Sequence, residues 1–511
     1  MKARSPEVEK HKCKISGDYE KNIEYMNSTL GVPESFDVLW RSLKIKGRKV
    51  SIYSINGMVN SQVMATLLNT LVTPAYEQFE HEKEDVRTVL QFIEDRITGV
   101  DVKEVETMDK VIYFLLSGPI AVFVEGYDKA IIADIRIYPA RNPGEPDIER
   151  VTRGSRDGFV ETLVMNTALI RRRLRDPSLR MELVQVGDRS QTDVCIVYLD
   201  NVTNLDLVKK IKDEIKDISI DGIPMAEKSV EEFILGSKFW NPFPRVRYTE
   251  RPDVAAMHIL EGHVLIIVDT SPSVIIAPAT FWHHVQHAEE YRQEPIVGAF
   301  LRWVRFVGIF ISIYILPLWL GVALNPESLP QWLQFMGVPQ TGRIPLFVQV
   351  LMAEFGVELV RMAAIHTPGP LTTALGLVAT FMIGDVAIKT GVFSQEILLY
   401  IAMAAVGTFA TPSPEFAHAN RLVRLFLVIC TGLLGLPGLL IGVTLTFLLL
   451  VRTKSFGVPY LWPLIPLDIK ALATILVRSP VPIKNRRPSI LKPQDPIRQP
   501  EGHQEEKKQE K

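Results

Sequence analysis

The sequence predicts an α+β domain of two similar α/β subdomains, followed by a polytopic transmembrane helical domain and a basic tail. Three observations predict this class. Strand-like and helical patterns alternate through most of residues 34–290. Part of that order recurs at one fixed shift along the chain. Residues 301–451 are then poor in charged residues and rich in apolar ones, in a chain of 511 residues whose net charge is only −1.

The composition excludes several classes of protein. A net charge of −1 gives no global sign of a nucleic-acid partner. The three cysteines, Cys13, Cys195 and Cys430, lie far apart, which argues against a zinc site and against a disulfide scaffold. The polar first 30 residues lack the apolar core of a signal peptide. We therefore expect the large N-terminal part to face the cytoplasm.

Residues 1–33 are charged and polar, and we expect a flexible arm there. The first α/β subdomain is predicted over residues 34–150. Asn56-Gly57 is a turn signal between a strand and a helix. The predicted elements are a strand at Lys49–Ile55, helices at Val59–Leu71 and Val86–Ile97, and a hairpin of Ile120–Val124 and Ala130–Ile137.

Two separate segments match later ones at the same shift of 144 residues. Val50–Met64 aligns without a gap on Val194–Val208, and Ser117–Ile132 aligns on Glu261–Ile276. The match is one of pattern more than of identity. It predicts a duplicated subdomain, the second copy covering residues 181–290. Convergent strand–turn–helix patterning is the alternative.

Residues 151–180 are predicted to be a connecting helix with a basic end. Positive charge at a helix C-terminus suits the helix dipole and a solvated face. The alternative is a docking patch for phospholipid headgroups or an acidic partner. The residues concerned are Arg171, Arg172, Arg173 and Arg175.

No motif in the sequence indicates an enzyme. His283 and His287 have i, i+4 spacing, but no general-base Glu lies between them, so we interpret them and His284 as interfacial or surface histidines and expect no metal. The sequence contains no Gly-rich phosphate loop and no nucleophile elbow. We expect no cofactor.

The transmembrane helical domain is predicted over residues 291–452. Its apolar segments are Phe306–Leu324, Leu371–Ile388, the short Ile397–Thr411, and Leu425–Val451. The last segment has 27 uncharged residues, long for one helix, and Leu436-Pro437-Gly438 in its middle predicts either a kink or a hairpin.

Pro345–His366 is apolar, yet it carries ionisable residues on one helical stripe, namely Glu354, Glu358 and Arg361. Ionisable groups at membrane depth usually face a bundle interior, a partner or a watery path. The segment is therefore an interfacial amphipathic helix, a helix joined to others by a Glu–Arg pair, or a pore-lining helix. A second intramembrane candidate is Asp385, which has i, i+4 spacing to Lys389.

Residues 453–511 form a Pro-rich, initially basic tail that we expect to be cytoplasmic, largely disordered and near anionic lipid. With both ends inside, the number of crossings is even. Four crossings follow if Pro345–His366 does not cross. Six follow if it crosses and the last apolar segment is a hairpin.

Several motifs together resemble the A subunits of the GerA spore-germination receptors, over about Phe36 to Pro466. They are SRDGFVETLVMNTALIRRRLRDPSLR from Ser155, SIDGI from Ser219, NPFPRVRYTERPD from Asn241, EGHVLIIVDTSPSVIIAPATF from Glu261 and SFGVPYLWPLIP from Ser455. The resemblance implies a multi-pass protein of the forespore and spore inner membrane, with its N-terminal domain and tail in the spore core.

The resemblance also implies a ring-shaped homo-oligomer that conducts ions during germination beside an integral-membrane partner subunit. A ring of carboxylates from Glu354 and Glu358 would favour cations. Two alternatives remain: a receptor subunit that transmits a nutrient signal without conducting, and a scaffold that clusters germinant receptor complexes.

Overall fold

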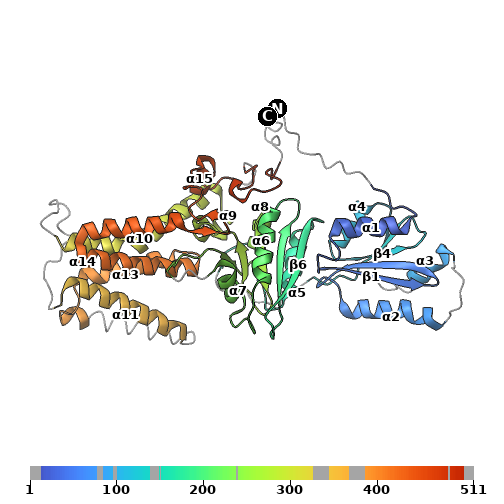
Figure 1. Cartoon of the computed structure of the whole chain (residues 1–511), viewed down its shortest axis with the longest axis horizontal. Coiled ribbons are helices and arrows are strands. Elements are labelled where there is room, and N and C mark those ends of the chain that lie inside the picture. The colour runs from blue at the N-terminus through green and yellow to red at the C-terminus, as the bar shows by residue number, and fades with distance from the viewer. Residues whose placement is uncertain are drawn as a thin grey trace, which may run out of the picture. The chain divides into compact units, whose positions relative to one another are not determined.

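The computed structural model describes residues 13–77, 85–95, 101–138, 149, 151–236, 240–325, 344–366, 386–480 and 484–499. The chain divides into two compact units. The α/β unit comprises Met1–Ser237, Tyr248–Pro278 and Pro480–Lys511, and the helical unit comprises Lys238–Arg247 and Ala279–Ser479. Figure 1 labels the elements of both.

The α/β unit contains two five-stranded antiparallel sheets, and the first has the order β1-β2-β4-β5-β3. Helices cover both of its faces, which explains why the central strands are buried throughout. One face packs on α1 and α4, the other on α2 and α3 (Figure 1). The strands are β1 (Val38–Ile45), β2 (Arg48–Ile55), β3 (Val102–Val105), β4 (Ile120–Val124) and β5 (Ala130–Ala133); the helices are α1 (Tyr19–Leu30), α2 (Ser61–Glu77), α3 (Val86–Glu94) and α4 (Met108–Leu115).

The second sheet repeats this order as β6-β7-β9-β10-β8, which confirms the predicted duplication. The strands β2, β4 and β5 reappear at the predicted shift of 144 residues as β7, β9 and β10. The second set comprises strands β6 (Leu179–Val186), β7 (Thr192–Leu199), β8 (Arg247–Thr249), β9 (Val264–Val268) and β10 (Val274–Ala277), and helices α5 (Leu163–Arg173), α6 (Leu205–Lys216), α7 (Ala226–Leu235) and α8 (Pro252–Glu261).

The predicted arm at residues 1–33 is wrong for its described part, because Tyr19–Leu30 forms the capped helix α1. The segment is polar on average, but Tyr19, Ile23, Met26 and Leu30 lie on one face and enter the core. Asp18 caps the helix by accepting from the backbone N–H of Lys21. The apolar stripe is short and lies within a charged sequence, so the composition of residues 1–33 suggested a flexible arm.

The helix with a basic end that was predicted within 151–180 is present as α5, but its assignment as a connector is wrong, because α5 is the counterpart of α1 and the first helix of the second subdomain. The two helices share a buried asparagine in equivalent positions. Asn22 bonds both backbone polar groups of Ser16, and Asn166 bonds both backbone polar groups of Val160. Each asparagine fixes the chain entering its helix, so the repeat extends to the local hydrogen bonding.

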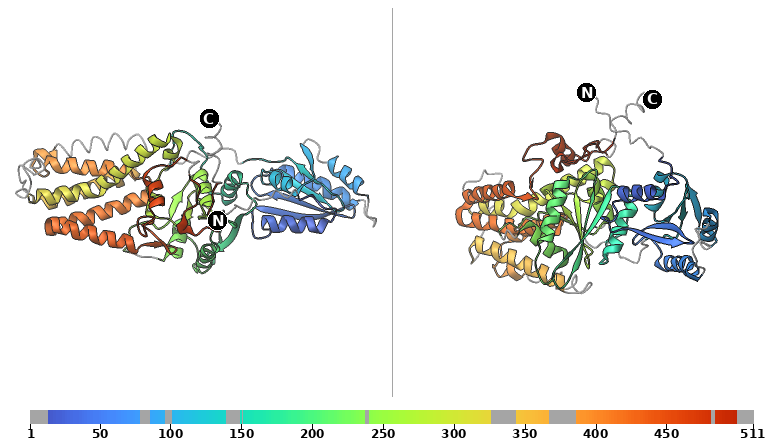
Figure 2. Two further views of the ribbon diagram at one scale, coloured as in Figure 1. Left: turned by 90° about the horizontal axis from the view of Figure 1, so that it is seen from above. Right: turned by 45° about the vertical axis from the view of Figure 1, so that its right-hand side comes forward.

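Long apolar helices dominate the helical unit, where α10, α13 and α14 lie together and α11 lies along one side (Figure 2). Among the described residues, α10 and α14 are long and apolar enough to span a membrane, and α13 is shorter. Most of the predicted span Leu371–Ile388 lies outside the described residues. The elements are η1 (Phe281–His284), α9 (Ala288–Arg292), α10 (Pro295–Ala323), α11 (Leu346–His366), α13 (Gln395–Phe409), α14 (Pro414–Arg452), β11 (Lys454–Ser455), β12 (Val458–Pro459) and α15 (Ile469–Leu476).

Helix α14 folds back on itself at Gly435, whose φ of 65° and ψ of −150° are not helical. Gly438 consequently lies directly against the backbone carbonyl of Cys430. In a continuous helix two residues eight apart are separated by about 12 Å along the axis. The element is therefore a hairpin of two arms, the second of the two alternatives that Leu436-Pro437-Gly438 predicted. Close contact between the arms requires a residue without a side chain at Gly438.

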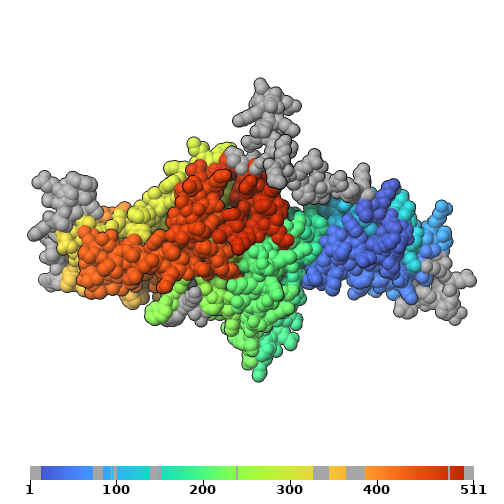
Figure 3. All heavy atoms as spheres, turned by 45° about the horizontal axis from the view of Figure 1, so that its top comes forward, coloured from blue at the N-terminus to red at the C-terminus, as the bar shows by residue number. Residues whose placement is uncertain are grey.

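The predicted disorder of residues 453–511 is wrong for its described part. Residues 454–476 contain β11, β12 and α15 in the helical unit. Residues 484–499, which include η5 (Ser489–Leu491), bind the second α/β subdomain. Figure 3 shows these residues in red against the green subdomain. Proline and charge suggested a solvated tail, but specific polar contacts to the α/β unit order this segment.

Candidate functional site

The helical unit contains a buried polar cluster, defined here as Glu354, Glu358, Arg361, Arg421 and Arg424. Its deepest pair is Glu354 of α11 with Arg424 of α14, and both side chains are buried. Arg424 Nε lies 2.7 Å from Glu354 Oε1, and Arg424 Nη2 donates to Oε2 at 2.9 Å. Of these two contacts only the one from Nη2 to Oε2 has hydrogen-bond geometry, and the closeness of Nε and Oε1 adds an ionic contact.

Arg424 also reaches the other two helices. Its Nη1 donates to the backbone carbonyl of Ser312 in α10 at 2.8 Å, and lies 3.4 Å from the hydroxyl of Thr408 in α13. One guanidinium therefore joins α10, α11, α13 and α14. One turn earlier, Asn420 is buried, and neither atom of its amide has a hydrogen-bond partner within the described part of the chain.

The shallower pairs of the cluster are centred on Glu358. Arg361, one turn later on α11, donates to Glu358 Oε2 from Nε at 2.8 Å, and Arg421 Nη1 of α14 donates to Oε1 at 3.2 Å. Glu358 keeps 33% of its side chain exposed, unlike Glu354. The structure therefore brings together three of the four predicted intramembrane residues, while Asp385 lies outside the described residues.

Arg421 and Arg424 directly precede the predicted apolar segment Leu425–Val451, and nothing in the sequence analysis paired them with α11. Their i, i+3 spacing matches that of Glu354 and Glu358 closely enough for two antiparallel helices to align both pairs. That correspondence is the signal that could have identified the partners. It requires knowing that the two helices are neighbours, which periodicity alone does not give.

A second buried ionic group lies at the start of α10. Glu290 is fully buried and accepts from Arg302 Nε at 2.7 Å, with Arg305 Nη1 in contact with its other oxygen. Arg302 Nη1 also donates to the carbonyl oxygens of Thr474 and Ile475, at 3.2 and 2.5 Å. The guanidinium thus caps the C-terminal end of α15, where unpaired helix carbonyls concentrate negative charge.

The basic end of α5 divides into different environments. Arg171 is 1% exposed and its Nε lies 2.7 Å from Asp37 Oδ2, so it joins the two α/β subdomains and is not available to a partner. Arg173 binds Asp157 at 2.9 Å, and Arg172 lies over the ring of Tyr138 at 4.6 Å. Arg175 is exposed and donates to Ser117 Oγ at 3.1 Å. Docking through these arginines stays a prediction for the three that reach the surface.

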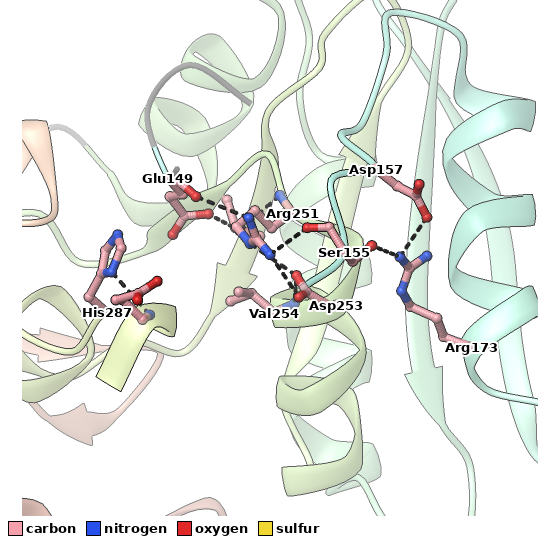
Figure 4. A network of polar contacts seen from close by, with 10 residues as sticks. Glu149, Ser155, Asp157, Arg173, Arg251, Asp253, Val254 and His287 are labelled. Atoms are coloured by element: carbon pink, nitrogen blue, oxygen red, sulfur yellow. Dashed lines mark hydrogen bonds and ion pairs between the residues drawn. The ribbon is translucent and has the colours of Figure 1, made fainter. Parts of the chain in front are cut away.

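Arg251 is a buried arginine that the sequence did not single out (Figure 4). It donates from Nη1 to the carbonyl of Glu149 at 3.1 Å and from Nη2 to that of Ser155 at 3.0 Å. Asp253 accepts from Nε and Nη2, which neutralises the charge. These contacts fasten the segment that leads into α5 to the N-terminus of α8.

Each of the three histidines has a local structural contact. His283 Nδ1 accepts from the backbone N–H of Thr280, and His287 Nδ1 accepts from that of Glu289. His284 is buried against the rings of Phe416 and Tyr460. Burial, together with the charge of Arg247, lowers the pKa of His284 to about 3, so it stays neutral at physiological pH. The described residues contain no group of three or more metal-ligating side chains.

The C-terminal segment 484–499 caps the end of α8 through Glu261. Lys484 Nζ lies 2.6 Å from Glu261 Oε1, Arg498 lies 3.4 Å away, and Arg487 Nε donates to the carbonyl of Leu260 at 2.8 Å. Burial by itself would raise the pKa of Glu261, but Lys484, with His258 and His263, lowers it to about 2. Positive charge from the segment thus meets the negative end of the helix.

We expect this contact to weaken in acid. A carboxyl with a depressed folded-state pKa contributes stability that is present above its unfolded pKa of about 4.3 and is lost as the pH falls towards about 2. Lys484→Ala should raise the pKa of Glu261 and move the loss to higher pH. Peptide-level hydrogen exchange of residues 484–499 at several pH values measures this. Lys492→Ala, an exposed lysine in the same segment, is the control; equal profiles for both variants would contradict the assignment.

Comparison with known proteins places these features in a family. The family model described as Bacillus/Clostridium GerA spore germination protein matches residues 24–490. Stage V sporulation protein AF of Bacillus subtilis (strain 168) is 48% identical over 97% of this chain and 99% of its own length. Spore germination protein KA of the same organism is 29% identical over 95% of this chain and 89% of its own. The N-terminal domain of the A subunit of the Bacillus megaterium spore germinant receptor GerK3 aligns with 52% of this chain and 97% of its own, at 27% identity and a TM-score of 0.41.

Proposed function

This chain belongs to the Bacillus/Clostridium GerA family of spore germination proteins, and on that premise we propose that it is a subunit of an oligomeric cation-conducting channel in the spore inner membrane. The observation that carries the proposal is the buried polar cluster inside an apolar bundle. Ionisable side chains at membrane depth are costly to retain and usually mark an ion path or a gate. We propose a homo-oligomeric ring and an integral-membrane partner subunit as its assembly.

The distribution of polarity supports a membrane location for the helical unit. Large apolar side chains are exposed along its helices, for example Phe310, Phe355 and Leu440, whereas the charged pair Glu354 and Arg424 is buried. A water-soluble bundle has the opposite arrangement, because exposing so much contiguous apolar surface to water is unfavourable. Lipid is the solvent that suits this exterior.

The helix directions support six crossings. Gly308 contacts Gly407 and Trp319 stacks on Tyr400, so α10 and α13 are antiparallel. The pairs Glu354–Arg424 and Glu358–Arg421 make α11 antiparallel to the first arm of α14. The hairpin of α14 adds two crossings.

Contacts of Arg424 with Ser312 and of Gly321 with Thr431 make α10 parallel to the first arm of α14, so α11 and α13 run the same way. Six crossings also require a crossing between α11 and α13, and the sequence predicts one at Leu371–Ile388. In this topology both ends of the chain face the spore core.

The pairing also suggests how conduction is controlled. Both carboxylates are bound to arginines, and the cluster holds two carboxylates against three guanidiniums. A net positive lining opposes cation passage. Conduction therefore requires the pairs to separate, so we assign the described arrangement to a closed state.

We expect Glu358→Gln to reduce cation flux while the protein still assembles. The substitution leaves Arg361 and Arg421 without a counter-charge in the polar cluster, which makes the path more positive. Single-channel currents from purified protein in planar bilayers, alone and with co-purified membrane proteins, are the measurement. Glu396→Gln, at the start of α13, is the matched control. Unchanged currents in a normally assembled Glu358→Gln protein would rule out this role.

Two other functions make different predictions. A receptor subunit that only transmits a nutrient signal gives no current, and its activity depends on a specific germinant in spores that lack other receptors. A scaffold gives no current and keeps its function when residues 367–451 are replaced by another membrane anchor. Silence of an oligomeric, purified protein in both bilayer conditions would favour these two.

A further inference from the structure

We propose that the segment Leu464–Val477, with α15 at its centre, is an interfacial element that lies in the headgroup layer of the membrane beside the start of α10. This inference rests on the proposed membrane location of the helical unit. It adds a surface that contacts phospholipid, outside the buried polar cluster. The argument uses three observations: the exposed face of the segment, its attachment to α10, and the length of α10.

The exposed face of this segment is apolar beyond what a soluble helix requires. Ile469 is 71% exposed and Leu467 is 63% exposed, with Leu464 and Val477 also open to the surroundings. Residues 455–480 contain only three charged side chains, Asp468, Lys470 and Arg478. Of these, Asp468 caps α15 and Arg478 is buried. This face therefore has few groups that can form hydrogen bonds with water.

The exposed arc of α15 is itself divided into an apolar and a polar part. At 100° per residue Ile469 and Ala473 lie about 40° apart, and Lys470 and Thr474 occupy the adjoining sector. The opposite side, which includes Ile475, is buried in the protein. A helix lying in a bilayer surface needs this division, with its apolar sector towards the acyl chains and lysine reaching the headgroups.

The segment is attached firmly to α10. Arg302 donates to the carbonyl oxygens of Thr474 and Ile475, and Glu290 neutralises Arg302. Arg478 packs against Gly298, where an added Cβ would lie 2.7 Å from Arg478 Cδ. Arg478 Nη2 also donates to the carbonyl of Tyr291 at 3.0 Å. The depth of α15 is therefore set by the depth of the first turns of α10.

The length of α10 puts those turns at the membrane surface. Its 29 residues measure about 43 Å, whereas the hydrocarbon core of a bilayer is about 30 Å thick. The part of α10 that exceeds the hydrocarbon core extends into a headgroup layer. Arg302 and Arg305 indicate that this part is the N-terminal end of the helix. Apolar side chains of that end are exposed too, such as Ile296 and Phe300. Because Arg302 and Arg478 hold α15 beside this end of α10, we expect the same headgroup layer to cover both.

Nitroxide labels on the full-length protein in lipid nanodiscs test the proposal. The background replaces Cys13 and Cys430, and single cysteines are introduced as Ile469→Cys, Lys470→Cys, Phe310→Cys in mid-α10, and Glu214→Cys on α6 of the α/β unit. Relaxation by oxygen, which concentrates in lipid, is compared with relaxation by a water-soluble nickel chelate. We expect the ratio at Ile469 to exceed that at Glu214 severalfold, with Lys470 between them.

The remaining outcomes overturn the proposal in distinguishable ways. An Ile469 label as open to nickel as Glu214 means that the face is in water. A label shielded from both reagents means that another protein surface covers it. If the Phe310 label is exposed to lipid, either of these two results rejects only the proposal that Leu464–Val477 lies in the headgroup layer. A water-exposed Phe310 label rejects the membrane location of α10, and with it the proposed function.

Discussion

Replacing Arg424 with methionine is expected to destabilise the helical unit by about 3–5 kcal/mol, the usual result of leaving one partner of a buried ion pair uncompensated. Glu354 would then remain buried without its counter-charge, and Ser312 and Thr408 would lose a donor. Thermal unfolding of the purified protein in detergent measures the change. Glu354→Gln should have a similar effect, because Arg424 is then the uncompensated group.

A double variant separates loss of the pair from loss of packing. Glu354→Met combined with Arg424→Met removes both charges and should recover much of the stability, since apolar replacements of a buried pair are often neutral. Glu358→Gln is the control on the same helix, because Glu358 is partly exposed. If Arg424→Met were as stable as Glu358→Gln, the four-helix connection through Arg424 would be wrong.

The second large effect is expected at the contact between the two α/β subdomains. Arg171→Met should leave Asp37 buried without a counter-charge, at a cost of about 3–5 kcal/mol. Arg171 also donates to the carbonyl oxygens of Asp176 and Leu179, and Ser35 donates to Asp37. Hydrogen exchange of peptides from β1 and β6 in the full-length chain is the measurement. Faster exchange is expected in both strands.

Arg173→Met is the matched control for this experiment. Arg173 lies on the same helix and binds Asp157, a carboxylate that is 37% exposed. Exposed pairs contribute about 0–1 kcal/mol, so exchange in β1 and β6 should hardly change. Equal effects of the two substitutions would show that the basic end of α5 acts as one charged surface and not through a buried pair.

The repeat could be predicted from sequence because strands carry their signal locally. Five or six consecutive apolar residues identify β4, β7 and β9 without knowledge of their neighbours, and β2 is identified by its β-branched and aromatic residues before the Asn56-Gly57 turn. The equivalence of α1 and α5 was not predicted, because the two helices differ at most positions. The same shift of 144 residues relates Ser16 to Val160 and Asn22 to Asn166, and the matching hydrogen bonds show that these pairs correspond.

The polar cluster could likewise be predicted only in part from the sequence. Periodicity aligned Glu354, Glu358 and Arg361 on one face of a helix, which the structure has as α11. It could not choose their partners, because a carboxylate stripe suits a pore, an interface or an ion pair equally well. The choice depends on which helix packs opposite, and that is a property of the fold. The order in residues 484–499 was missed for the same reason, since Glu261 is 223 positions from Lys484.

On the proposed membrane location of the helical unit, the reversal at Gly435 bears on how the protein enters a lipid bilayer. Its two arms are contiguous in the chain and in contact through Gly438 and Gly442. Such a hairpin can move from the translocation machinery into the bilayer as one unit, because no hydrophilic stretch has to cross the hydrocarbon core. Arg452 and Lys454 follow at once and act as a stop, so synthesis of this last apolar region fixes its orientation in a single event.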